Sequence, residues 1–146
     1  MTLWRISRHR DLSGLGGLRA DGRWHSSGQP IVYLSESPSA ALLEVCVHTA
    51  ANDIPPEFTL LRIEGPDLEV PSITVDELPD GWQKQVEITR DLGMHWLRAK
   101  SGALLRVPSA ILPETANYLF NPLHPDAKKF QITEAMVYPF DARLKK

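Results

Sequence analysis

A single carboxylate interrupts an apolar segment that is otherwise well suited to form a buried helix. Residues 40–47 read Ala-Ala-Leu-Leu-Glu-Val-Cys-Val, and Glu44 is the only charge among them. Ser37 and Pro38 come just before this run, in the order typical of a helix N-cap followed by proline at the first helical position. A helix that is apolar on nearly every side is expected to be buried. Because burying an unpaired carboxylate is costly, Glu44 is either a paired structural acid or a functional one.

The bulk properties restrict the classes of protein to consider. The 146 residues suit one domain, and 42% hydrophobic with 23% charged residues is ordinary for a globular protein. A net charge of −2 gives no electrostatic reason to expect direct nucleic-acid binding. Cys46 is the only cysteine, so an internal disulfide is excluded, and we expect it to be a small core residue. No signal peptide or membrane span is evident, so we expect a cytoplasmic protein that binds no membrane.

The pattern of apolar residues predicts one α+β domain over residues 1–146, with a small central mixed sheet and flanking helices. Helices are predicted at 38–49 and 83–100, the second from the four-residue repeat of Ile88, Leu92 and Trp96. Residues 66–81 and 113–125 are expected to be irregular. The glycine-rich loop at 13–18 is followed by Arg19 where a dinucleotide-binding motif needs glycine, so a Rossmann fold is not supported. Strands are predicted at 3–7, 31–35, 58–64, 103–107 and 131–140.

Residues upstream of Glu44 suggest what a functional carboxylate would act on. Arg23 lies beside glycine and tryptophan in a polar loop, where its guanidinium can bind phosphate. Trp24 and Tyr33 offer flat faces for stacking, and the predicted strand delivers Tyr33 and Ser35 close to the start of the helix that carries Glu44. A buried acid can orient a sugar hydroxyl or stabilise a cationic sugar-like transition state. Together these groups suit a substrate with phosphates, an aromatic base and a ribose, such as a nicotinamide dinucleotide.

Each of these residues also has a simpler interpretation. Arg23 alone is typical of a surface or salt-bridge arginine, and Glu44 with His48 can be an internal pair four residues apart on one helix. His25 with Ser26 or Ser27 would make a hydrolase site, but no G-x-S-x-G pattern supports it. The five histidines lack metal-ligand spacing, so we expect no metal cofactor.

Taken together, several sequence blocks resemble the RES domain, the toxin component of the bacterial Xre–RES toxin–antitoxin systems. The resemblance covers nearly the whole chain in matching order. The blocks are Gly22-Arg23-Trp24, Ile31 to Ser37, Leu42-Leu43-Glu44-Val45, Gly81-Trp82, Leu105 to Ala110 and Asn117 to Pro125.

The resemblance implies a fold related to the ADP-ribosyltransferase toxins and an activity that consumes NAD as a substrate. The family name marks an arginine, a glutamate and a serine, which correspond to Arg23, Glu44 and Ser109. Tyr33 matches the active-site tyrosine, while His25 stands where many members have asparagine. Arg23, Tyr33 and Glu44 are therefore the expected catalytic residues. The expected NAD-binding residues are Arg5, Trp24, Ser35, Ser109, Asn117 and Asn121.

Three functions remain open from the sequence. The first is NAD degradation by hydrolysis or phosphorolysis of the nicotinamide–ribose bond. The second is mono-ADP-ribosylation of a cellular protein, and the third is an inactive NAD-binding module. The resemblance also implies a cognate Xre-type antitoxin with a helix-turn-helix, through which alone this chain would contact DNA. Self-association as a homodimer is left open.

Overall fold

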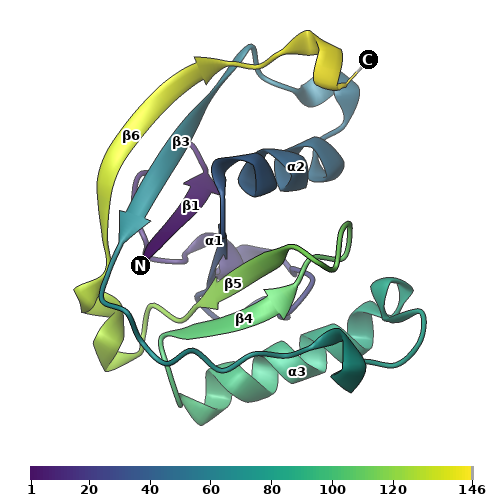
Figure 1. The fold of residues 1–146 in the computed structure, drawn as a ribbon, viewed down its shortest axis with the longest axis vertical. Helices are drawn as coiled ribbons and strands as arrows, with labels where there is room; N and C mark the ends of the chain where they lie inside the picture. The colour runs from purple at the N-terminus through teal and green to yellow at the C-terminus, as the bar shows by residue number, and fades with distance from the viewer. Residues whose placement is uncertain (146) are drawn as a thin grey trace.

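The computed structural model describes residues 1–145, which form a six-stranded sheet with helices around it (Figure 1). The strands are β1 (Thr2–Ile6), β2 (Val32–Ser35), β3 (Glu57–Glu64), β4 (Leu104–Pro108), β5 (Ala116–Phe120) and β6 (Gln131–Pro139). Their order across the sheet is β4-β5-β2-β1-β3-β6, and every ladder is antiparallel.

The expected mixed sheet is therefore wrong, and the connection between β2 and β3 shows why. A helical connection does join these strands, as in a parallel unit, but β1 lies between them and pairs antiparallel with both. The parallel pairing recorded among residues 1–145 is an isolated bridge between Ser72 and Arg106.

The helices lie at different places around this sheet. They are α1 (Gly16–Arg19), α2 (Pro38–His48) and α3 (Val86–Ala99), with short 3₁₀ turns at Ala51–Asp53, Val75–Glu77, Trp82–Lys84, Pro125–Lys129 and Ala142–Leu144. In Figure 1, α3 runs alongside β4 and β5, whereas α2 lies near β1 at the other end of the molecule. None of the helices in the described part of the chain is both long and apolar enough to cross a bilayer.

Alternating side chains divide the interior into two hydrophobic clusters. Leu104 and Phe120 belong to one cluster, while their neighbours Leu105 and Leu119 belong to the other, as the period of two in a strand requires. The second cluster includes three tryptophans, Trp24, Trp82 and Trp96, and joins α3 to the sheet. The loop before β2 belongs to this second cluster through Trp24, and the same loop forms one wall of the site described below.

The start of α2 is confirmed, but its burial is not. The Ser37 hydroxyl accepts a hydrogen bond from the Ala40 N–H at 3.1 Å, and Pro38 occupies the first helical turn. However, only Ala40 and Ala41 are buried, and the remaining residues of α2 are half-buried or exposed, Cys46 being half-buried. The helix lies at the rim of the sheet, so its apolar composition does not translate into full burial.

Two further expectations from the pattern are also corrected. Residues 116–120 form the internal strand β5 rather than irregular chain, because pairing with β2 and β4 on both sides compensates for a short segment bounded by prolines. Helix α3 forms as predicted, but its buried face contains Thr89 and Gly93. Leu92, expected on the buried face, is 38% exposed. The long connection at 66–81 is confirmed as mostly irregular.

Candidate functional site

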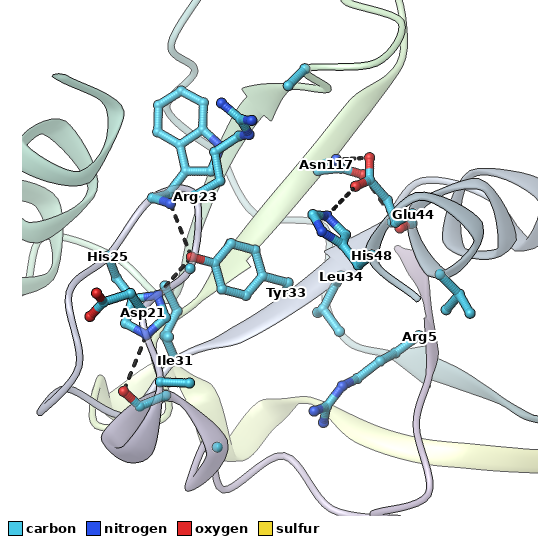
Figure 2. Close-up of a pocket in the computed structure, with 18 of the residues that line it drawn as sticks. Arg5, Asp21, Arg23, His25, Ile31, Tyr33, Leu34, Glu44, His48 and Asn117 are labelled. Carbon is cyan, nitrogen blue, oxygen red and sulfur yellow. Dashed lines mark hydrogen bonds and ion pairs between the residues drawn. The ribbon is translucent and has the colours of Figure 1, made fainter. Parts of the chain in front are cut away.

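A pocket of about 650 Å³ lies between α2, strands β1, β2 and β5, and the loop that precedes β2. This volume is within the usual range for small-molecule sites. All the expected site residues except Ser109 and Asn121 line it, namely Arg5, Arg23, Trp24, Tyr33, Ser35, Glu44 and Asn117. The topology thus brings residues from three strands, one helix and a loop to one cavity. Figure 2 shows Tyr33 between the loop groups and the Glu44 group.

The carboxylate of Glu44 is held by donors from three parts of the chain. Its Oε1 accepts hydrogen bonds from the Ser109 hydroxyl and the Asn117 amide, both at 3.0 Å. Its Oε2 lies 3.3 Å from Nε2 of His48, one helical turn further along α2. Burial favours the neutral acid, but the bonds from His48, Asn117 and Ser109 outweigh it and hold the pKa of Glu44 below its ordinary value.

The direction of the Ser109 bond is fixed by its surroundings. Ser109 is fully buried just after β4, and its oxygen accepts from the backbone N–H groups of Ile111 and Leu112 at 3.2 and 3.4 Å. The hydroxyl proton is therefore available for Glu44. In the same way, the Ser35 hydroxyl donates to Oδ1 of Asn117 at 3.4 Å, which leaves the amide protons of Asn117 for Glu44.

The hydroxyl of Tyr33 points away from Glu44 and toward the preceding loop (Figure 2). It accepts from the backbone N–H of Trp24 at 3.1 Å and lies 2.7 Å from Nδ1 of His25. Nε2 of His25 lies 3.2 Å from the Gly17 carbonyl, which can only accept, so Nε2 carries the proton and Nδ1 accepts from Tyr33. Burial raises the pKa of Tyr33 to about 12 and lowers that of His25. The phenol is thus a neutral, anchored group whose ring lines the pocket.

Helix α3 fixes the loop that carries Arg23. The Thr89 hydroxyl donates to the Arg23 carbonyl at 2.6 Å, and Nε of Arg90 donates to the Gly22 carbonyl at 2.8 Å. A Cβ on Gly93 would lie 1.7 Å from the Trp24 carbonyl oxygen, so only glycine permits this approach.

Three arginines line the pocket, and two of them, Arg5 and Arg23, lie on opposite sides of Tyr33 (Figure 2). Nη1 of Arg23 donates to the Gln83 carbonyl at 3.0 Å, and Nη1 of Arg5 donates to the Asp11 carbonyl at 3.2 Å. Burial lowers the pKa of Arg5, partly offset by the nearby Asp11 carboxylate. Within residues 1–145 neither arginine forms an ion pair with a carboxylate. The remaining guanidinium nitrogens are free to bind an anion with separated charges, such as a diphosphate.

The side chains of two expected site residues stabilise the fold rather than present a group to a substrate. Trp24 contributes to the pocket wall, but its ring is buried against Trp82, with centroids 6.2 Å apart, so the ring offers no face for stacking a substrate. Asn121 is buried at the end of β5, where its Oδ1 accepts from the Leu123 N–H at 3.0 Å and stabilises a turn.

The sequence prediction did not include His48, Arg90 and Thr89 among the site residues. His48 was noted only as an internal partner of Glu44, whereas the structure places it on the pocket wall. Nothing in the sequence signalled Thr89 or Arg90, because both act through backbone carbonyls of a loop more than sixty residues away. Among the described residues, no three His, Cys, Asp or Glu side chains are grouped as a metal site would require.

Comparisons with known proteins agree with the resemblance seen in the sequence. The family model described as the RES domain matches residues 2–141. A protein named "Toxin Res" from Pseudomonas putida is 51% identical over 146 residues, covering 99% of each chain. A "Prs ADP-ribosylating toxin" from a Sphingobium species is 36% identical, covering 98% of this chain and 96% of that one.

The fold is similar to that of a chain in the crystal structure of the Mycobacterium tuberculosis MbcT–MbcA toxin–antitoxin complex. The TM-score is 0.69 at 23% identity, over 98% of this chain and 85% of the other. The expected family and the single α+β domain are confirmed by these likenesses.

Proposed function

Because this chain belongs to the RES domain family, we propose that it is the toxin of a toxin–antitoxin pair and that it breaks the nicotinamide–ribose bond of NAD. The observation that carries the proposal is the Glu44 carboxylate, kept ionised by aligned donors beside the Tyr33 ring and two arginines without carboxylate partners. This combination matches the charges and rings of a nicotinamide dinucleotide.

In the proposed reaction the protein stabilises charge rather than transferring protons. The C–N bond breaks with its electron pair going to the pyridinium nitrogen, so nicotinamide leaves neutral and the ribose becomes oxocarbenium-like. Glu44 stabilises this cation, since a preorganised negative group acts where positive charge develops. Arg23 and Arg5 bind the diphosphate and fix its position. Tyr33 presents its ring to the nicotinamide end, while Ser109 and Asn117 act on Glu44.

The acceptor of the ribosyl cation distinguishes the two leading activities. Water or phosphate gives NAD degradation, which we place first. A protein side chain gives ADP-ribosylation, and the name of the Sphingobium relative favours this second candidate. In an inactive NAD-binding module the same site would bind NAD without turnover.

The partner follows from the same family assignment. The solved structure with the similar fold is a toxin–antitoxin complex, which supports a cognate antitoxin for this chain. We propose an antitoxin of the Xre type that covers the pocket near Arg23 and Glu44. The toxin would act in the cytoplasm, where its substrate is found.

The test is incubation of the purified protein with NAD, with and without inorganic phosphate, followed by mass analysis of the products. Nicotinamide with ADP-ribose indicates hydrolysis, and a phosphorylated ADP-ribose that forms only with phosphate indicates phosphorolysis. Consumption of NAD only when a cell extract is present, with ADP-ribose found on protein, indicates transfer. Intact NAD under all three conditions would contradict the proposed activity.

Glu44→Gln keeps the shape of the side chain and removes its charge. We expect the rate of NAD cleavage to fall by about 10²- to 10³-fold, the usual effect of removing one preorganised stabilising group. The amide oxygen of the new side chain can still accept from Ser109 and Asn117, so the fold should persist by circular dichroism. Glu69→Gln, at an exposed position away from the pocket, is the matched control. Equal activity of the two variants would exclude Glu44 from catalysis.

A further inference from the structure

His48 is a titratable group at the pocket wall, beside Glu44, that the proposed mechanism does not use. It lies one turn after Glu44 on α2, with Nε2 3.3 Å from Oε2, and its side chain is 66% exposed. The Glu44 side chain is 26% exposed, so the pair runs from the interior of the pocket to its mouth.

The two carboxylate oxygens of Glu44 have different hydrogen-bond partners. Oε1 has both lone pairs directed at fixed neutral donors, Ser109 and Asn117. Oε2 has His48 as its partner, so one acceptor direction of Oε2 remains for a sugar hydroxyl or a ribosyl cation. His48 therefore acts on Oε2, the oxygen of Glu44 that faces the substrate.

We infer that His48 is a positioning residue for Glu44, and that its protonation sets the net charge of the pair at zero or −1. This inference rests on the proposed function. With a neutral His48, the full negative charge of Glu44 faces the ribosyl cation. With a protonated His48, the pair is neutral, so it stabilises the transition state less but repels the diphosphate less as well. Protonation should therefore lower both kcat and KM.

Several neighbouring groups influence the pKa of His48. Arg23, from the loop before β2, opposes protonation of His48, and the Lys145 ammonium binds the Cys46 and Thr49 carbonyls at the end of α2. The bond to Glu44 is the stronger influence and raises the pKa of His48 above 6.5. Burial lowers the pKa of His25, the other pocket histidine, and that of Tyr33 is about 12, so these groups titrate in other ranges.

The test compares the steady-state kinetics of NAD cleavage between pH 6 and 9 for the wild-type protein, His48→Gln and His48→Ala. In the wild type, kcat and KM should both rise with pH, by up to about tenfold for a coupling of one pKa unit between the two groups. Glutamine retains an N–H donor without a titration, so kcat should become independent of pH and stay close to the high-pH value. Alanine should lower kcat at every pH, because Oε2 loses its partner.

His95→Gln is the matched control, since His95 is an exposed histidine of α3 that does not line the pocket. It should keep the wild-type profile. A His48→Gln profile that rises with pH as the wild type does would overturn the inference.

A second readout separates this inference from the proposed function. The His48 ring resonance can be assigned by its loss in His48→Gln and followed by NMR against pH. Its pKa should fall in Glu44→Gln, and an unchanged pKa would overturn the inference whatever the activity. NAD left intact by the wild-type protein would overturn the proposed function, while the NMR titration would still decide whether the pair is coupled.

Discussion

At the scale of single residues, polar side chains that look interchangeable in the sequence have different hydrogen-bond partners in the pocket. Ser109 and Asn117 direct their protons at one oxygen of Glu44, whereas the Tyr33 hydroxyl is directed at His25 and Trp24. The phenol oxygen is therefore already occupied by partners within the protein. What remains of Tyr33 for a substrate is the face of its ring.

This assignment predicts different results for two substitutions of Tyr33. Tyr33→Phe keeps the ring, so we expect NAD cleavage within about threefold of wild type, while the unpaired groups on His25 and Trp24 cost about 1–3 kcal/mol of unfolding free energy. Tyr33→Ala removes the ring and should abolish most of the activity. Urea denaturation and steady-state rates measure both effects.

Tyr138→Phe, at an exposed position on β6, is the control and should change neither stability nor rate. If Tyr33→Phe lost as much activity as Tyr33→Ala, the hydroxyl rather than the ring would contact the substrate.

Some of these residue-level assignments were accessible from the sequence and others were not. Glu44 was identified because a charge in an apolar helix is unfavourable without a role or partner, and Ser37 because its capping chemistry is local. Trp24 and Asn121 were placed at the site by sequence proximity and resemblance, but whether a ring faces a cavity or the core depends on tertiary packing. In Trp24 the decisive partner is Trp82, fifty-eight positions later.

At the scale of elements, the site depends on how closely α3 approaches the loop that precedes β2. Thr89 and Arg90 donate hydrogen bonds to the carbonyls of Arg23 and Gly22. Gly93 leaves room for the carbonyl of Trp24. Helix α3 lines the pocket mainly through its first turns, yet it determines where the backbone of Arg23 lies. Its apolar repeat predicted the helix correctly but could not reveal this polar contact.

Gly93→Ala should displace that loop. Alanine is intrinsically better than glycine in a helix by about 1 kcal/mol, which alone would stabilise the protein. The new Cβ would lie 1.7 Å from a backbone oxygen, however, so helix and loop must separate. Overpacking of this kind costs about 1–3 kcal/mol, and we expect a net loss of stability together with a raised KM for NAD.

Gly102→Ala serves as the comparison, because the nearest atom to its Cβ is the Leu104 carbonyl oxygen at 3.7 Å, an ordinary contact. It should leave stability and KM close to wild type. If Gly93→Ala had a higher melting temperature than wild type and an unchanged KM, the loop would tolerate the displacement.

At the scale of the whole molecule, the pocket draws on segments from Arg5 to Asn117, and the sheet order brings the strands among them together. Strand β5 is central to this arrangement, since it pairs with β2 and delivers Asn117 opposite Ser35. The sequence predicted every other strand, and the missing one is a short segment bounded by prolines that gains its stability from neighbours on both sides. Local pattern could not supply that information, and the resemblance to a family supplied the site instead.

A ligand that contacts so many separate segments should stabilise the fold as a whole. We expect NAD to raise the melting temperature of Glu44→Gln in a dose-dependent manner, because the slow cleavage by this variant leaves most of the NAD intact during the measurement. At a hundredfold excess over Kd, binding to the folded state alone contributes about 2.7 kcal/mol.

Adding Arg23→Gln to Glu44→Gln should reduce this thermal shift, because one of the two diphosphate contacts is lost. Adding Arg98→Gln instead, at an exposed arginine of α3 outside the pocket, should preserve it. Equal shifts for the two double variants would show that NAD binds without Arg23.

The hydrogen bonds around Glu44 also determine how protons can move in the site. The protons of Ser109 and Asn117 point toward the carboxylate, and the same bonds lower its pKa, so Glu44 is a weak base with no inner neighbour to receive a proton. A neutral acceptor must then release its proton at the mouth of the pocket, to solvent or to His48. An acceptor that arrives already ionised has no proton to release, so in the proposed reaction phosphate would need no base from this site, whereas water would need one at the mouth of the pocket.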